Sequence, residues 1–146
     1  MKAQALNILV MDGETRPALA IVRSLGSKGH RMIVGAKVQP SLAQVSRYCH
    51  RRFTHPDPVR DGTGFIDALI RAVCEEQIDV VLPVTEITTA LVVERRREIE
   101  RYCRVPFPVA DTFNIAANKA EVLALAEKLS VPIPIGVVLD SPGACP

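Results

Sequence analysis

The sequence is poor in aromatic residues and has little excess of either charge. Its 146 residues include no tryptophan, two tyrosines and four phenylalanines, so the core must be aliphatic. A formal net charge of +2 is too small to predict nucleic acid or an anionic membrane as a default partner. Because 48% of the residues are apolar and 23% are charged, the composition is typical of a folded globular domain.

Metal-ligand spacing and targeting segments are also lacking. The four cysteines form no C-x-x-C pair, and the three histidines are isolated, so the sequence predicts no metal site. The apolar run before Asp12 is too short for a signal peptide or a membrane span. We therefore expect a cytoplasmic protein whose thiols are reduced, without a membrane or nucleic-acid partner.

Positive charge gathers in two places. The arginines between Arg95 and Arg104 alternate with glutamates, and pairs such as Arg96 and Glu100 have helical spacing. This pattern predicts a solvated, salt-bridged helix face and not a binding patch. The other group, at Arg47–Arg52, belongs to a polar stretch that runs from residue 37 to residue 60.

Continuous apolar runs predict buried strands. Ile8–Met11 and Ile78–Val84 have this character and are expected to be neighbouring central strands of a parallel sheet. Shorter strands are predicted at Met32–Gly35, Arg52–Thr54, Phe107–Val109 and Ile135–Leu139.

Helices are predicted where apolar residues recur at positions i, i+3, i+4 and i+7. Thr15 and Thr85 are candidate N-caps, and Asn118 forms an N-x-x-E capping box with Glu121. The helix after Thr85 is expected to continue to about Tyr102 and to bury Ile87, Leu91, Ile99 and Tyr102. The remaining stripes are Ala18–Leu25, Ile66–Val73 and Val122–Leu129, and a short helical turn is expected from Asp111.

Alternating strands and helices predict an α/β fold, a Rossmann-like three-layer domain with a mostly parallel sheet. Ligands of such sheets bind at the carboxyl ends of the strands. In this sequence that edge collects four segments: Asp12–Arg16, Gly35–Lys37, Pro83–Glu86 and Ala110–Thr112.

The loop Asp12–Arg16 precedes a helix, so its N–H groups could hold an anion or could simply form a tight turn and cap. A dinucleotide site is disfavoured, because G-x-G-x-x-G requires three glycines and this loop has only Gly13. The carboxylates of Asp12 and Glu14 would also repel a pyrophosphate. Lys37 follows the second strand where a ribose-binding acid is expected.

Two charged residues at predicted helix starts have two interpretations each. Glu86 either complements the helix dipole or faces a substrate in the crevice. Lys119 is a cation in a first turn, which opposes the dipole. An exposed lysine tolerates this small cost, whereas a bound phosphate would reverse it.

Three stretches together resemble the N-terminal, pre-ATP-grasp domain of ATP-grasp enzymes. Ile8–Pro17 resembles its first strand and loop, and Asp79–Glu86 resembles its fourth strand and P-x-x-E turn. The segment from Asn118 to Pro134 resembles the linker helix, which usually starts with D-K and ends with G-V-P-x-P. Here Asn118 replaces the aspartate and Ser130 the glycine.

The resemblance implies a carboxylate–amine ligase, similar to carbamoyl-phosphate synthase and more distantly to biotin carboxylase. Such enzymes use ATP and Mg²⁺ to form an acylphosphate, which an amine then attacks. Lys119 matches the linker lysine that reaches the ATP phosphates. The substrate-side crevice is expected to contain Asp12, Gly13, Glu14, Arg16, Thr85 and Glu86.

The resemblance divides the chain into a pre-ATP-grasp domain at residues 1–117 and a linker helix with the start of the ATP-grasp part at residues 118–146. The family's phosphate-covering loop and magnesium ligands belong to the part that follows, so no catalytic residue or metal ligand is assigned here. We expect the isolated chain to be inactive. A self-contained α/β binding or regulatory module is the alternative, and a homodimer stays open.

Overall fold

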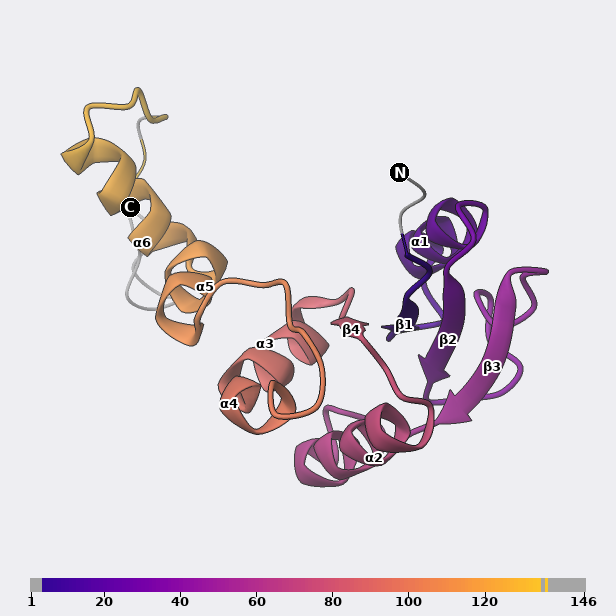
Figure 1. The fold of residues 1–146 in the computed structure, drawn as a ribbon. Coiled ribbons are helices and arrows are strands. Elements are labelled where there is room, and N and C mark those ends of the chain that lie inside the picture. The colour runs from indigo at the N-terminus through magenta and orange to yellow at the C-terminus, as the bar shows by residue number, and fades with distance from the viewer. Residues whose placement is uncertain (1–3, 135, 137–146) are drawn as a thin grey trace. The chain divides into compact units, whose positions relative to one another are not determined.

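The computed structural model describes residues 4–134 and residue 136 (Figure 1). The chain forms two compact units, Met1–Val109 and Ala110–Pro146, which are described separately. The expected division at residues 117 and 118 falls inside the second unit, between its two helices. None of the described helices is long and apolar enough to cross a membrane.

The first unit is built on a four-stranded parallel sheet with the order β3-β2-β1-β4. Its strands are β1 (Asn7–Val10), β2 (Arg31–Ala36), β3 (Cys49–Thr54) and β4 (Val80–Leu82). The predicted α/β, Rossmann-like class is confirmed. The predicted pairing of the first strand with the strand near residue 80 is also confirmed, with Leu9 opposite Val81.

β4 is the last named strand of the sheet, not a central one, but its outer edge is covered. The Val81 N–H donates to the Arg104 carbonyl at 3.0 Å, and the Arg104 N–H donates to the Asp79 carbonyl at 2.9 Å. The strand predicted at Phe107–Val109 is wrong. Instead of that strand, this single bridge lies next to β4. Pro106 and Pro108 flank Phe107 and cannot donate to a ladder.

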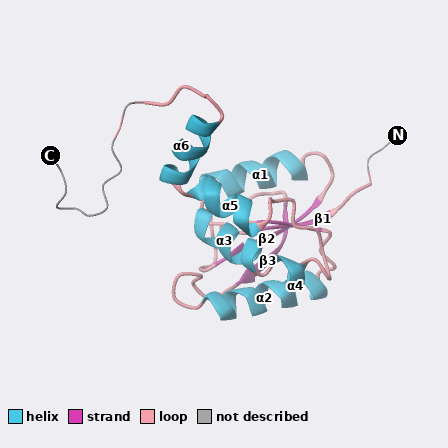
Figure 2. Cartoon of the chain, turned by 90° about the vertical axis from the view of Figure 1, so that its left-hand side faces the viewer, coloured by secondary structure: helices cyan, strands magenta, loops and turns pink. Residues whose placement is uncertain are grey.

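Helices cover both faces of the sheet (Figure 2). α1 (Arg16–Gly26) packs Ala18 and Val22 with the side chains of one face, where Ile8 and Val10 lie. α2 (Gly62–Glu75) packs Phe65 and Leu69 with those of the other face, where Leu9 lies. These two aliphatic clusters make the three-layer core.

The long helix predicted from Thr85 to Tyr102 is wrong in its length. It ends at Glu94, and α3 (Glu86–Glu94) is followed by the short α4 (Arg96–Ile99). The break resets the helical register, so Ile87 and Tyr102 are 49% and 53% exposed, whereas Ile99 is buried and Leu91 partly buried. The salt-bridged arginine face is confirmed by the pairs Arg95–Glu98 and Arg96–Glu100.

The second unit contains α5 (Ala110–Ala117) and α6 (Lys119–Lys128). The predicted capping box is present: the Asn118 side chain accepts hydrogen bonds from the N–H groups of Ala120 and Glu121. The predicted packing stripe is wrong, because its leading members Val122, Leu125 and Leu129 are all exposed. Apart from Gly136, the strand predicted at Ile135–Leu139 lies outside the described residues.

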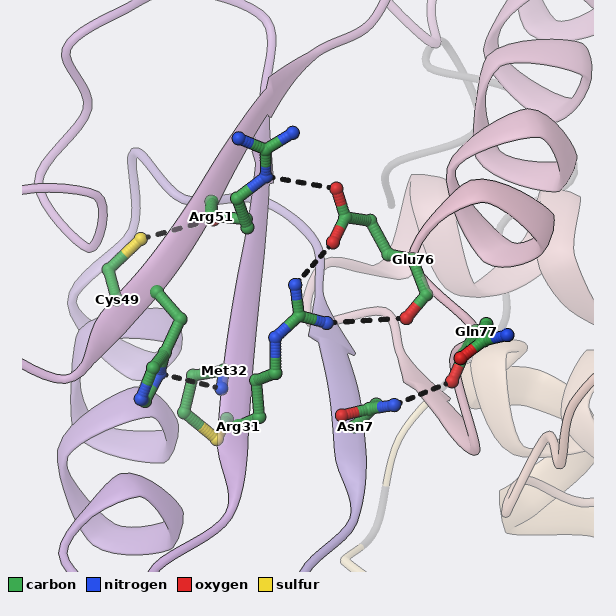
Figure 3. A network of polar contacts seen from close by, with 8 residues as sticks. Asn7, Arg31, Met32, Cys49, Arg51, Glu76 and Gln77 are labelled. Carbon is green, nitrogen blue, oxygen red and sulfur yellow. Dashed lines mark hydrogen bonds and ion pairs between the residues drawn. The ribbon is translucent and has the colours of Figure 1, made fainter.

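Glu76, just after α2, connects that helix to two strands (Figure 3). One carboxylate oxygen pairs with the Arg31 guanidinium of β2 at 2.5 Å, and the other with that of Arg51 of β3 at 3.0 Å. Hydrogen bonds from Arg31 and then from Arg51 lower the pKa of the Glu76 carboxyl below its usual value. The carboxylate form therefore stabilises the fold.

Replacing Glu76 with glutamine tests this link. A depressed folded-state pKa contributes stability above the unfolded pKa of about 4.3, and this stability is lost as pH falls. We expect Glu76→Gln to lower the free energy of unfolding at pH 7 by up to about 1 kcal/mol, because both arginines are partly exposed. The difference should shrink near pH 3. Urea unfolding at both pH values measures it, with Glu75→Gln as the control, and an equal loss at both would contradict the assignment.

Candidate functional site

The Asp12 carboxylate lies where β1 and β4 end. Asp12 is 7% exposed, and its backbone has a left-handed φ of 58°. One carboxylate oxygen accepts from the N–H groups of Val84 and Thr85, both at 2.9 Å, and from the Thr88 hydroxyl at 2.6 Å. The other accepts from the Thr85 hydroxyl at 3.1 Å. All four donors belong to the turn after β4 and the start of α3.

This contact spans the point where the sheet order reverses. From β1 the chain goes to β2 on one side, and β4 pairs on the other side of β1. In open α/β sheets, such a point is the usual place for a ligand. Here the Asp12 carboxylate occupies it and complements the positive end of α3. Asp12 is a positioning residue, with its oxygen atoms bound to the protein.

Gly13 permits the close approach of the loop that follows β2. Its N–H donates to the Gly35 carbonyl at 2.9 Å, and its own carbonyl accepts from the Ala43 N–H at 2.7 Å. A Cβ atom at Gly13 would lie 2.6 Å from the Ser41 hydroxyl oxygen and 2.8 Å from a Val34 methyl carbon. No side chain fits without displacing that loop.

The Glu14 carboxylate is also bound internally. One of its oxygens accepts from the Lys37 N–H at 2.6 Å and from the Val38 N–H at 3.3 Å. The sequence analysis held that two carboxylates would repel a pyrophosphate from this loop. In the structure, both carboxylates bind the polypeptide on either side of the loop.

Two charged side chains of the predicted crevice remain directed to solvent. Arg16 begins α1 after the Thr15 cap, and Glu86 begins α3 after the Thr85 cap. Both are exposed, and neither has an ion-pair partner among the described residues. They are the charged side chains of the predicted crevice that a ligand can reach, and at the same edge the exposed Lys37 pairs with Asp57 at 3.6 Å.

Lys119 belongs to the second unit, where it begins α6. It is exposed and has no ion-pair partner in the part of the chain that the structure describes. The sequence analysis anticipated a cation in a first turn, opposing the helix dipole. Its role toward ATP stays a prediction.

Two buried polar atoms near the same edge were not predicted. Ser41 and His55 are each 5% exposed, and the Ser41 hydroxyl and the His55 Nε2 have no hydrogen-bond partner among the described residues. His55 Nδ1 lies 2.8 Å from the Pro56 carbonyl, so it serves as the donor there. The sequence feature that could have indicated Ser41 and His55 is their position in the loops directly after β2 and β3.

The described residues contain no group of three or more histidine, cysteine, aspartate or glutamate side chains placed to hold a metal ion. The predicted crevice therefore offers two exposed charges of opposite sign, those of Arg16 and Glu86. This arrangement can orient a zwitterionic or dipolar molecule. It does not provide a metal centre.

Comparison with solved structures places this architecture in a known fold. No protein-family model and no curated protein matches the chain. An L-amino acid ligase from Bacillus licheniformis matches with a TM-score of 0.71 and 12% identity over 91% of this chain and 32% of that one. A biotin carboxylase from Campylobacter jejuni, in complex with β,γ-ATP, matches with a TM-score of 0.67 and 16% identity over 92% and 30%.

A third structure, the biotin carboxylase domain of a single-chain bacterial carboxylase, matches with a TM-score of 0.66 and 19% identity over 88% of this chain and 30% of that one. These structures are ATP-grasp enzymes, matched mostly through their N-terminal parts. The chain thus has the fold of that N-terminal domain, as the sequence resemblance predicted. It spans about a third of their length.

Replacing Asp12 with asparagine tests the carboxylate contact. The amide has one acceptor oxygen for four donors, while asparagine still tolerates the left-handed backbone. We expect Asp12→Asn to lower the free energy of unfolding by about 2 kcal/mol, because buried N–H groups lose a charged acceptor. Urea unfolding measures this. Glu14→Gln is the matched control and should cost less, since its two donors are more exposed; equal stability of Asp12→Asn and the wild type would refute the assignment.

Proposed function

We propose that this chain forms the N-terminal, substrate-side domain of an ATP-dependent carboxylate–amine ligase. The observation that carries the proposal is the fold of the N-terminal part of ATP-grasp enzymes, combined with exposed charges at the expected positions. Because the chain spans about a third of the matched enzymes, the remaining contacts to ATP are assigned to a further domain. Residues 1–146 alone are proposed to be inactive.

The proposed reaction has two steps. A carboxylate oxygen of the substrate attacks the γ-phosphorus of ATP, which forms an acylphosphate and releases ADP. An amine nitrogen then attacks the carbonyl carbon, phosphate leaves, and the nitrogen loses a proton. The described residues do not form a Mg²⁺ site, so no step is assigned to a metal held by this chain.

Within this scheme, the carboxyl edge of the sheet orients the substrate. Arg16 is an exposed cation there with no ion-pair partner among the described residues, and a guanidinium suits a carboxylate because it can donate two parallel hydrogen bonds. Glu86 is the exposed anion and suits a cationic amine. Asp12 supports both indirectly, since it holds the turn before α3 against the end of β1.

Lys119 is proposed to contact an ATP phosphate. The lysine begins α6, where the Asn118 side chain accepts hydrogen bonds from the N–H groups of Ala120 and Glu121, and the lysine itself is exposed. A phosphate next to this ammonium would gain both its charge and the favourable end of the helix dipole. The unfavourable position of the lysine would then be compensated by its ligand.

Lys119→Ala in the full-length protein tests this role. Loss of a charge-assisted phosphate contact, worth about 1.5–3 kcal/mol, should weaken ATP binding by roughly ten- to a hundredfold. Isothermal titration calorimetry measures the change. Lys128→Ala is the matched control, because Lys128 is an exposed lysine in the last turn of the same helix. Unchanged ATP affinity in Lys119→Ala would remove this residue from the proposed site.

Arg16→Ala tests the substrate side independently. We expect the KM for the carboxylate to rise about tenfold or more, while the KM for ATP changes little, because the guanidinium contacts only the carboxylate. Steady-state kinetics of the full-length protein separate the two constants. Arg23→Ala, at an exposed position in the last turn of α1, serves as the control. A parallel rise in both constants would contradict the assignment of Arg16.

A further inference from the structure

Among the described residues, the outer edge of β3 has no neighbouring strand, because β3 is the terminal strand of the sheet. Just beyond it, the His55 N–H donates to the Ala36 carbonyl of β2 at 3.2 Å. Peptide groups along a parallel strand alternate between its two sides, so Arg51 and Phe53 also face β2. The N–H and C=O groups of Arg52 and Thr54 consequently point outward.

A groove runs along this edge, between β3 and α2. Its volume is about 310 Å³, and it is lined by the strand from Arg51 to Thr54 and by one side of α2. Ala68 and Ala72 of α2 lie along it and leave room for a short apolar side chain. The groove belongs entirely to the first unit and extends along β3 to its last residue, Thr54.

Guanidinium groups dominate the charge of the groove. Arg51, Arg52 and Arg71 line it together with Glu75 and Glu76. Glu76 is already bound by Arg31 and Arg51, as Figure 3 shows. Arg52 and Arg71 are exposed and have no ion-pair partner in the described ranges. Because neighbouring residues of a strand alternate, Arg51 and Arg52 lie on opposite faces.

A second copy of this chain does not fit a pairing centred on these two arginines. A two-fold pair of edge strands is antiparallel, so pairing centred on Arg51 and Arg52 would bring like charges opposite each other, which is destabilising. An acidic strand would instead meet a guanidinium on each face. The groove thus combines outward-pointing backbone donors and acceptors, an apolar floor and flanking arginines. A ligand that matches all three has a polypeptide backbone and carboxylates.

We propose that this groove binds an extended, acidic segment of a partner polypeptide, which adds to β3 as a fifth strand. The backbone of the segment pairs with Arg52 and Thr54. Its carboxylates contact Arg52 on one face and Arg71 on the α2 face, while small side chains lie along Ala68 and Ala72. The proposal does not depend on the ligase function, since it involves none of Lys119, Arg16 and Glu86.

A titration of the ¹⁵N-labelled chain tests the proposal, with a capped ten-residue peptide in which pairs of glutamates alternate with pairs of valines, so that both faces of the strand carry carboxylates. On binding, amide hydrogen exchange at Arg52 and Thr54 should slow by about tenfold or more, while Arg51 and Phe53, already paired with β2, should change little. The same peptide with glutamine for glutamate should bind about tenfold more weakly. Absence of binding, or chemical-shift changes without slowed exchange at Arg52 and Thr54, would overturn strand addition.

Variants separate this site from general attraction of anions to a basic surface. Arg52→Gln with Arg71→Gln should weaken the acidic peptide about tenfold or more, whereas Arg97→Gln, an exposed arginine of α4, should not. Arg52→Glu with Arg71→Glu should bind the lysine version of the peptide instead. Equal weakening by Arg97→Gln, or no weakening by the double variant, would refute the proposal. The glutamine peptide supplies a test that requires no variant to fold.

Discussion

The Asp12 carboxylate is the contact on which the candidate site depends. It is an acceptor for four donors that come from the turn after β4 and the start of α3. Without it, the partly buried N–H groups of Val84 and Thr85 would lose a charged partner at a cost of about 1–3 kcal/mol each. Because the Asp12 carboxylate holds the start of α3 beside the end of β1, it also determines where the exposed Glu86 side chain lies.

The charged residues at the carboxyl edge therefore have two different roles. Asp12 and Glu14 bind backbone N–H groups of the polypeptide, and Gly13 lets the loop after β2 approach. Arg16 and Glu86 stay exposed on helix starts that these contacts hold in place. The bound carboxylates of Asp12 and Glu14 thus hold the backbone in place. The exposed charges of Arg16 and Glu86 suit the orientation of a small dipolar substrate.

The elements that could be predicted from sequence are those whose signal is local. β1 and the strand near residue 80 were recognisable from unbroken apolar runs, and the cap of α6 from Asn118 and Glu121. The break of the helix at Arg95 was not, because no side-chain cap marks it.

The partners of Asp12 were beyond sequence reasoning for another reason. Its donors lie 72 to 76 residues further along the chain, so no spacing rule connects them. Asp12 was assigned to the right edge, yet its task depends on which strands become neighbours. The burial of Ser41 and His55 likewise depends on how two loops pack, which no local sequence pattern indicates.

The same separation has a kinetic consequence. A contact across more than seventy residues forms only after a long loop has closed, and the entropy of that closure is lost before the contact stabilises anything. β1, β2 and β3 can associate with α1 while the chain beyond residue 60 is still unfolded. The candidate site would then form last, when β4 pairs with β1 and the turn after β4 binds the Asp12 carboxylate.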